Sequence, residues 1–132
     1  MNYLENITLI LKEEGFFVNG MDSTDDPIDI QNLIAGFNAF KSIENQQILV
    51  IQIAQSRDVR FFDFLEYCIF NGTSEIVRHG ALKYLHYYKR EKNLLYIFER
   101  IEALGLRQSY GRFFSIAVDM IGGECRAKFG DS

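Results

Sequence analysis

The sequence predicts an all-α fold, and three observations support this prediction. The chain of 132 residues contains a single proline, Pro27. Long segments repeat apolar residues at spacings of three and four, which is the period of an amphipathic helix. Clusters of turn-forming residues that would separate short strands are sparse. We therefore predict one helical domain, residues 1–132, with about seven helices.

The first helix is expected over residues 2–14. Asn2 can cap it, and Glu5 follows three positions later, as in a capping box. Its apolar face consists of Leu4, Ile7 and Leu11. Gly15 is placed to end the helix. The next segment, FFVNGMDSTDD at residues 16–26, is predicted to be a loop with an apolar start and an acidic end.

Two helices are expected after this loop. Asp26 is predicted to cap the first of them, with Pro27 at its first helical position. This helix should end near Lys41. Its buried stripe consists of Ile30, Leu33, Ile34, Phe37 and Phe40. The next helix is predicted over residues 43–55, where β-branched residues leave a strand at residues 48–53 as the alternative.

Four more helices complete the predicted stack. Their expected ranges are residues 58–70, 75–89, 91–104 and 108–121. Ser74 is the predicted cap of the second of these, and Gly105 and Gly122 are placed to end the last two. The tail from Glu124 is predicted to be short, polar and frayed.

The last two helix pairs repeat each other at an offset of 33 residues. Under this shift the first helices match at apolar positions: Phe61, Phe62 and Leu65 fall on Leu94, Leu95 and Phe98. The second helices match in the same way: Val77, Ala81, Tyr84, Leu85 and Tyr88 fall on Tyr110, Phe114, Ala117, Val118 and Ile121. A constant offset over two helices is typical of stacked helical hairpins.

The segment RDVRFFDFLEYCIFNGTSEIVRHGALKYLHYY, residues 57–88, resembles one HEAT repeat. Its start resembles the Asp-x-Arg-Phe type opening of such repeats: Asp58, Arg60 and Phe61. Its second helix resembles the Glu-x-Val-Arg start followed by a small residue and leucine: Glu75, Val77, Arg78, Ala81 and Leu82. Gly80 departs from the alanine-like residue that is usual there, and it weakens the helix locally.

The resemblance extends over residues 27–122 as three repeats. It implies a short HEAT-like α-α superhelix with helix pairs at about 27–55, 58–88 and 91–122, preceded by a capping helix at about 2–14. Proteins of this type are chiefly scaffolds and partner-binding modules. The resemblance therefore implies a non-catalytic protein-binding surface.

We expect no enzyme activity, cofactor or metal. Residues 22–26 alternate like the start of a calcium-binding loop, but Pro27 and Leu33 stand where that loop needs glycine and glutamate. His79 and His86 are two helical turns apart, too far to share one metal easily. The sequence also lacks a glycine-rich phosphate-binding motif and the G-x-S-x-G pattern of hydrolases.

The sequence favours a cytoplasmic protein. Its N-terminus has no cationic region ahead of an apolar run, as a secretory signal would have. The longest apolar stretch, residues 48–53, is too short to span a membrane. Cys68 and Cys125 lie far apart without C-x-x-C spacing, so we interpret them as reduced thiols, with a disulfide as the alternative.

The net charge of −4 is unevenly distributed. Residues 1–66 hold 4 cations against 11 acids, a net charge of −7, and residues 67–132 hold 10 cations against 7 acids, a net charge of +3. Such asymmetry can steer a charged partner, and an ordinary solvated surface is the alternative. The oligomeric state remains open from the sequence.

The acidic half provides the first candidate site. Six acids between residues 13 and 29 are interleaved with apolar side chains and with no lysine or arginine. We predict a partner-binding surface made of Phe17, Asp22, Asp25, Asp26 and Asp29, because acids around an exposed ring suit a basic protein. In size, charge and helical repeat the chain is similar in type to small bacterial immunity proteins. Those bind one cognate toxin domain, often a basic nuclease, and neutralise it.

The basic half provides an alternative site. Arg78, Lys83, Tyr87 and Arg112 are predicted to form a cationic aromatic surface. Such a surface suits an adaptor that binds proteins, or a nucleic acid, because cations contact phosphates and rings stack on bases. The acidic pI of about 5.2 argues against a nucleic-acid partner.

Overall fold

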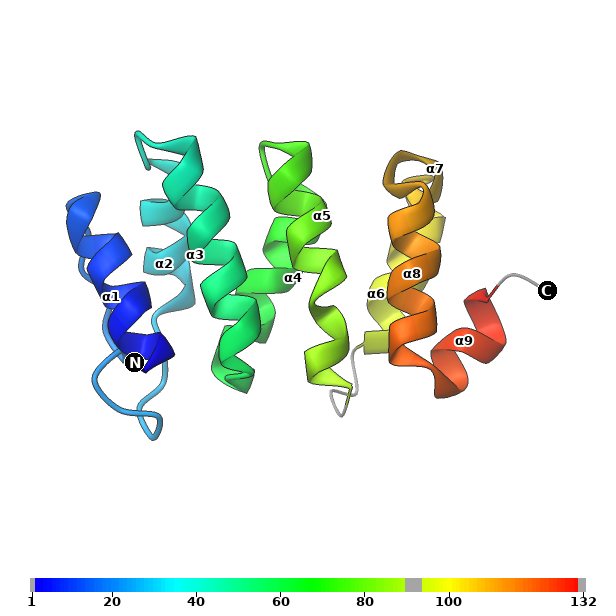
Figure 1. Cartoon of the computed structure of the whole chain (residues 1–132), viewed down its shortest axis with the longest axis horizontal. Coiled ribbons are helices and arrows are strands. Elements are labelled where there is room, and N and C mark those ends of the chain that lie inside the picture. The colour runs from blue at the N-terminus through cyan, green and yellow to red at the C-terminus, as the bar shows by residue number, and fades with distance from the viewer. Residues whose placement is uncertain (1, 90–93, 131–132) are drawn as a thin grey trace.

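The structure of the protein is a computed structural model, and it describes residues 2–89 and 94–130 (Figure 1). In chain order the helices are α1 (Tyr3–Glu13), α2 (Ile30–Asn38), α3 (Ile43–Ser56), the 3-10 helix η1 (Val59–Phe61), α4 (Phe62–Asn71), α5 (Glu75–Lys83), the 3-10 helix η2 (Leu85–Tyr88), α6 (Leu94–Ala103), α7 (Arg107–Tyr110), α8 (Arg112–Ile121) and α9 (Gly123–Phe129). All regular elements of the described ranges are helical, so the predicted all-α fold is confirmed. The strand considered for residues 48–53 is wrong, because they lie inside α3.

The helices form two layers (Figure 1). Helices α1, α3, α5 and α8 follow one another in the front layer, each in contact with the next. Helices α2, α4 and α6 lie behind them, and α9 packs against α8 and α6 at the end opposite α1. Neighbouring helices of the front layer therefore lie side by side and together form one face of the protein.

The core lies between these layers and is rich in aromatic rings. The largest fully buried side chains include Phe37, Phe61, Phe64, Phe98 and Phe114. Rings of Phe37 and Phe64 meet edge to face at 5.2 Å between centroids, and those of Phe98 and Phe114 at 5.3 Å. Edge-to-face pairs add to the stability gained from burial alone. The predicted stripe of the first helix is buried as expected: Leu4, Ile7 and Leu11.

Two predicted caps are confirmed. The Asn2 side chain accepts a hydrogen bond from the Leu4 amide at 2.8 Å, and the Ser74 hydroxyl accepts one from the Val77 amide at 3.1 Å. Gly15 ends the first helix in a left-handed conformation, with φ of 85°. The amide that follows it, at Phe16, then donates back to the carbonyl of Leu11 at 2.8 Å, which completes a Schellman motif.

The predicted start of the second helix is wrong. Helix α2 begins at Ile30 and is capped by Asp29, whose carboxylate accepts the Asn32 amide at 3.1 Å. Asp26 and Pro27 instead belong to the preceding loop. The backbone of both residues makes contacts within that loop. The Asp26 carbonyl accepts a hydrogen bond from Arg60. The Pro27 carbonyl lies so close to Gly20 that a Cβ placed on this glycine would stand 2.3 Å from its oxygen. Tertiary contacts therefore override a favourable local capping signal.

Three later boundaries also differ from the prediction. Helix α5 ends at Lys83 and continues as η2, and the expected last helix is divided at Gly111, where φ is 57°. The tail is helical, because Cys125 and Phe129 lie one turn apart and are both buried in α9. The expected frayed tail is therefore wrong. Residues 91–93 of the expected sixth helix lie outside the described residues.

Glu14 joins the end of α1 to the start of α3. Its carboxylate accepts from the Asn45 amide group at 2.6 Å and from the Lys41 backbone N–H at 2.7 Å. The Asn45 bond, followed by the Lys41 bond, lowers the pKa of Glu14. This glutamate thus has a structural role, unlike Asp22, Asp25 and Asp26 of the loop that follows it.

The Glu14→Gln variant is expected to be less stable than the wild type at neutral pH, with a difference that narrows in acid. A lowered pKa in the folded state stabilises the protein above the unfolded pKa, and this contribution is lost as the pH falls through the folded value. Urea unfolding at pH 7 and at pH 3 measures it, with the exposed neighbour Glu13→Gln as control. An equal difference at both pH values would contradict the assigned role.

Candidate functional site

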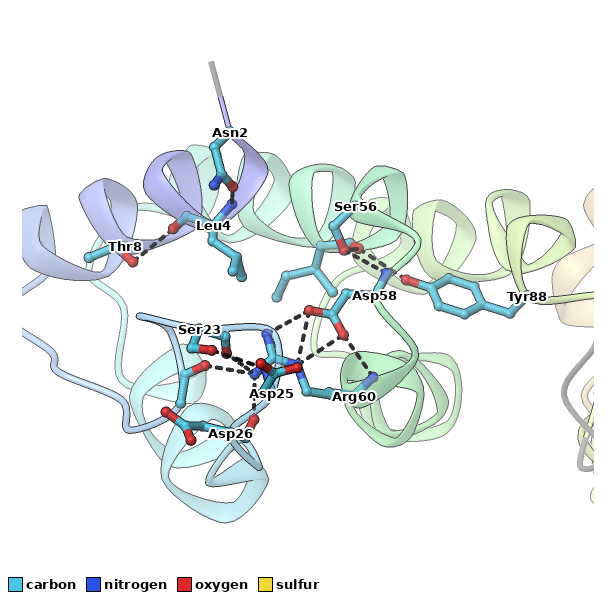
Figure 2. Close-up of polar contacts among 12 residues, drawn as sticks. Asn2, Leu4, Thr8, Ser23, Asp25, Asp26, Ser56, Asp58, Arg60 and Tyr88 are labelled. Carbon is cyan, nitrogen blue, oxygen red and sulfur yellow. Dashed lines mark hydrogen bonds and ion pairs between the residues drawn. The ribbon is translucent and has the colours of Figure 1, made fainter.

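Residues 16–29 form the loop between α1 and α2, and one arginine from η1 organises it (Figure 2). The Arg60 side chain points into the loop, where its Nη1 donates to the Gly20 carbonyl at 2.8 Å, to the Ser23 carbonyl at 2.7 Å and to the Asp26 carbonyl. Three carbonyls spread over seven residues thus converge on one guanidinium nitrogen. The Asp29 amide closes the loop by donating to the Asn19 carbonyl at 3.3 Å.

The charge of Arg60 is balanced inside the fold. Asp58 accepts from its Nη2 at 2.6 Å and from its Nε at 3.0 Å, in a bidentate pair whose side chains are 13% and 14% exposed. Bidentate arginine–carboxylate pairs are among the strongest hydrogen-bonded contacts in proteins. Arg60 therefore holds the loop by its backbone and is neutralised by Asp58, which leaves the loop's own carboxylates to solvent.

The four predicted aspartates all lie on this loop with exposed side chains: Asp22, Asp25, Asp26 and Asp29. None of the four takes part in an ion pair within the described ranges. Asp29 has a second task, because its carboxylate caps α2. The structure thus places the predicted acids together, three of them without a structural role for their side chains.

Phe17 stands at the start of the same loop and is 70% exposed. Its carbonyl accepts from the Asn32 side chain at 2.9 Å, which fixes the backbone beside the N-terminus of α2. The neighbouring Phe16 turns inward, 6.0 Å from the Phe40 ring and against Gly36. The outward ring is therefore presented on an anchored backbone.

A hollow of about 440 Å³ separates the loop from α1. It is lined by Asn2, Leu4, Glu5, Thr8, Leu9, Lys12, Met21 and Asp22. Leu9 is 58% exposed at its edge, next to two acids and one lysine of the same lining. Sequence reasoning missed this neighbourhood. The available signal was Leu9 itself, an apolar residue outside the buried stripe of the first helix.

The alternative basic site is divided by the structure. Arg78 is half-buried and donates to the Gly72 carbonyl at 2.6 Å. Lys83 lies 5.4 Å from the Tyr84 ring centroid, and Arg112 lies 5.8 Å from the centroid of Phe113. The rings of these two contacts, Tyr84 and Phe113, line one groove of the front layer, whereas Arg78 lines a different hollow together with Tyr110.

Tyr87, the fourth residue of that site, is covered by a cation from outside the prediction. The Arg57 guanidinium carbon stands 4.4 Å above its ring centroid. Arg57 is the C-cap of α3 and has a left-handed backbone, with φ of 56°. Sequence reasoning missed Arg57 because its partner lies 30 positions further along the chain.

The described part of the chain contains no cluster of three or more histidine, cysteine or acidic residues arranged to hold a metal. Cys68 and Cys125 are both buried with free thiols, and burial raises the pKa of Cys125 to about 11. Among the described helices, none is long and apolar enough to cross a membrane.

The loop between α1 and α2 thus combines a fixed backbone, unpaired carboxylates and one exposed ring, an arrangement suited to contact with a positively charged protein surface. We call its residues Phe17, Asp22, Asp25, Asp26 and Asp29 the acidic loop.

Models of protein families, curated proteins and solved structures were each compared with the chain, and none of them matches it.

Proposed function

We propose that this protein is a non-catalytic module that binds one basic partner protein through the acidic loop. The observation that carries the proposal is the anchoring of the loop by Arg60. A loop already ordered before binding loses little conformational entropy when a partner docks. Its unpaired aspartates attract the partner, and Phe17 supplies an apolar anchor that excludes water from the contact.

The more specific proposal is an immunity protein that neutralises a cognate bacterial toxin, with a basic nuclease domain as the expected type of toxin. Its support is the small size, the net charge of −7 over residues 1–66, and the exposed carboxylates of the loop. We also propose that the paired helices are HEAT-like repeats. The two-layer arrangement and the 33-residue offset support this assignment.

An adaptor that binds several proteins is the alternative, and it would use the same kind of helical surface. A nucleic-acid partner has less support. Arg78 is engaged with the Gly72 carbonyl, so it stands apart from Lys83 and Arg112. The three cations therefore do not form the single continuous patch that a phosphate backbone requires.

Affinity capture from the cell that naturally makes this chain tests the proposal. We expect wild-type bait to retain one stoichiometric basic protein, and the Asp25→Lys/Asp26→Lys bait to lose it, because charge reversal converts attraction into repulsion. The matched control is Asp63→Lys/Glu124→Lys, which makes the same change of charge at exposed positions on α4 and α9.

Thermal unfolding of each bait, compared with that of the wild type, tests whether a loss of binding comes from a loss of fold. Equal retention of the partner by wild type and by the loop variant would contradict the proposed surface. Many partners of comparable abundance would support the adaptor. Bound nucleic acid that is released steeply by salt would support a nucleic-acid-binding function.

A further inference from the structure

A second groove lies on the front layer, away from the acidic loop. It has a volume of about 260 Å³ and is formed by α3, α5 and α8. Its apolar lining consists of Val50, Ile51, Ile76, Gly80 and Phe113, and Gln47, His79, Lys83 and Tyr84 complete it. This volume is below the about 300–1,000 Å³ of typical small-molecule sites, and it suits a single inserted side chain.

Gly80 gives the groove its depth. A Cβ built on this residue would meet only Val50 Cγ1, at 3.9 Å, which is an ordinary van der Waals distance. Alanine would therefore fit, and it would favour the helix. By contrast, a Cβ at Gly72 would stand 2.6 Å from the Cys68 carbonyl. Packing requires glycine at residue 72 but not at residue 80, where its effect is to leave the groove open.

The rim of the groove is cationic. Lys83 lies over the Tyr84 ring, and Tyr84 stacks on Tyr87 at 5.7 Å with an interplanar angle of 22°. Arg57 lies over the Tyr87 ring, 4.4 Å from its centroid, and these two residues line a separate hollow. The Arg112 guanidinium lies 5.8 Å from the centroid of Phe113, the residue of α8 that lines the groove. These ring contacts place two cations, Lys83 and Arg112, against rings that line one apolar depression.

The acid Glu75 also lies near this rim. Glu75 is 3.7 Å from His79, and its side chain is 70% exposed. His79 itself stacks on the Phe113 ring at 4.4 Å, with an interplanar angle of 29°. The two rim cations Lys83 and Arg112 therefore outnumber Glu75, while Phe113 and Tyr84 each already have a stacking partner. An aliphatic or aromatic side chain fits this floor better than a stacked nucleic-acid base, which needs an uncovered ring.

We propose that the groove binds an acidic peptide segment of a partner protein. One large apolar side chain of the segment occupies the depression over Gly80, and flanking carboxylates face Lys83 and Arg112. The occupant follows from charge complementarity at the rim and from the apolar floor. This site is independent of the acidic loop, which selects the opposite charge, so the protein would join a basic partner to an acidic one.

The Gly80→Leu variant tests the proposal, because leucine favours the helix and fills the depression. Short synthetic peptides with a central leucine or phenylalanine between aspartates and glutamates serve as the probe, followed by amide chemical shifts and fluorescence anisotropy. We expect saturable shifts at Gly80, Lys83 and Phe113, and binding weakened at least about tenfold in Gly80→Leu. The control Ala103→Leu adds the same side chain at an exposed position of α6 and should bind like the wild type.

Lys83→Glu provides a second variant that leaves the floor intact, and it should weaken the same peptides about tenfold at low salt. The proposal is overturned if no acidic peptide shifts the groove amides, or if both variants bind like the wild type. Equal binding of lysine-flanked peptides would also overturn it, as would tighter binding of an oligothymidylate. Self-association lost in Gly80→Leu would assign the groove to a second copy of the chain instead.

Discussion

Replacing Arg60 by alanine is expected to lower the free energy of unfolding by about 3 kcal/mol, because removing one partner strands the other inside the fold. The variant leaves Asp58 as an unpaired, largely buried charge. It also removes the donor that joins three loop carbonyls, at Gly20, Ser23 and Asp26. Urea unfolding measures the loss of stability, and amide exchange of residues 20–26 should accelerate beyond the global change.

Two further variants separate the role of Arg60 from that of an ordinary surface cation. Arg126→Ala removes an exposed ion pair with Asp119 and should cost about 0.5 kcal/mol or less. Arg60→Lys keeps the charge beside Asp58 but lacks the planar fork, so it should restore only part of the stability. A loss below about 1 kcal/mol in Arg60→Ala, with unchanged exchange in the loop, would contradict the anchoring of the loop by this residue.

Replacing Phe129 by alanine is expected to destabilise the protein by about 3 kcal/mol, a value typical of a buried aromatic ring. Its side chain is buried at the end of the stack, with its ring 6.1 Å from that of Phe98 and 6.0 Å from that of Phe114. Its carbonyl also accepts from Arg107 at 3.1 Å. Removing the ring leaves a cavity that α9 cannot fill by itself.

Chemical unfolding of Phe129→Ala and of its neighbour Lys128→Ala measures this effect. Lys128 is exposed and pairs with Glu99 on the surface, so its removal should have an effect of a few tenths of a kcal/mol. A similarly small effect of Phe129→Ala would show that the tail is frayed, as the sequence suggests, and would contradict the docking of α9.

The sequence predicted the helical architecture where local signals and burial agree. Asn2 and Ser74 cap the helices that their positions indicate, and the stripe of Leu4, Ile7 and Leu11 is buried as its spacing requires. Pattern reasoning failed where a distant side chain decides the local structure. Asp26 and Pro27 form a good capping signal, but Arg60 holds the Asp26 carbonyl in the loop, and the Pro27 carbonyl lies where only a glycine at residue 20 leaves room for it.

The sequence predicted which residues make up the candidate site, but not the contacts that orient them. Clustering of acids along residues 22–29 is visible in the sequence, and the structure places those acids on one exposed loop. The opposite orientations of Phe16 and Phe17 depend on Gly36 and Asn32, which no local pattern specifies. Likewise, the separation of Arg78 from the other cations follows from its bond to Gly72.

The central claim is that the acidic loop steers a basic partner onto the protein. Its most direct test is the association rate constant of the captured partner with wild type and with Asp25→Lys/Asp26→Lys, measured at low and at high salt. Steering predicts association at least about tenfold slower in the variant at low salt, with the difference shrinking as salt screens the charges. Equal association rates at low salt, with both proteins folded, would contradict the claim.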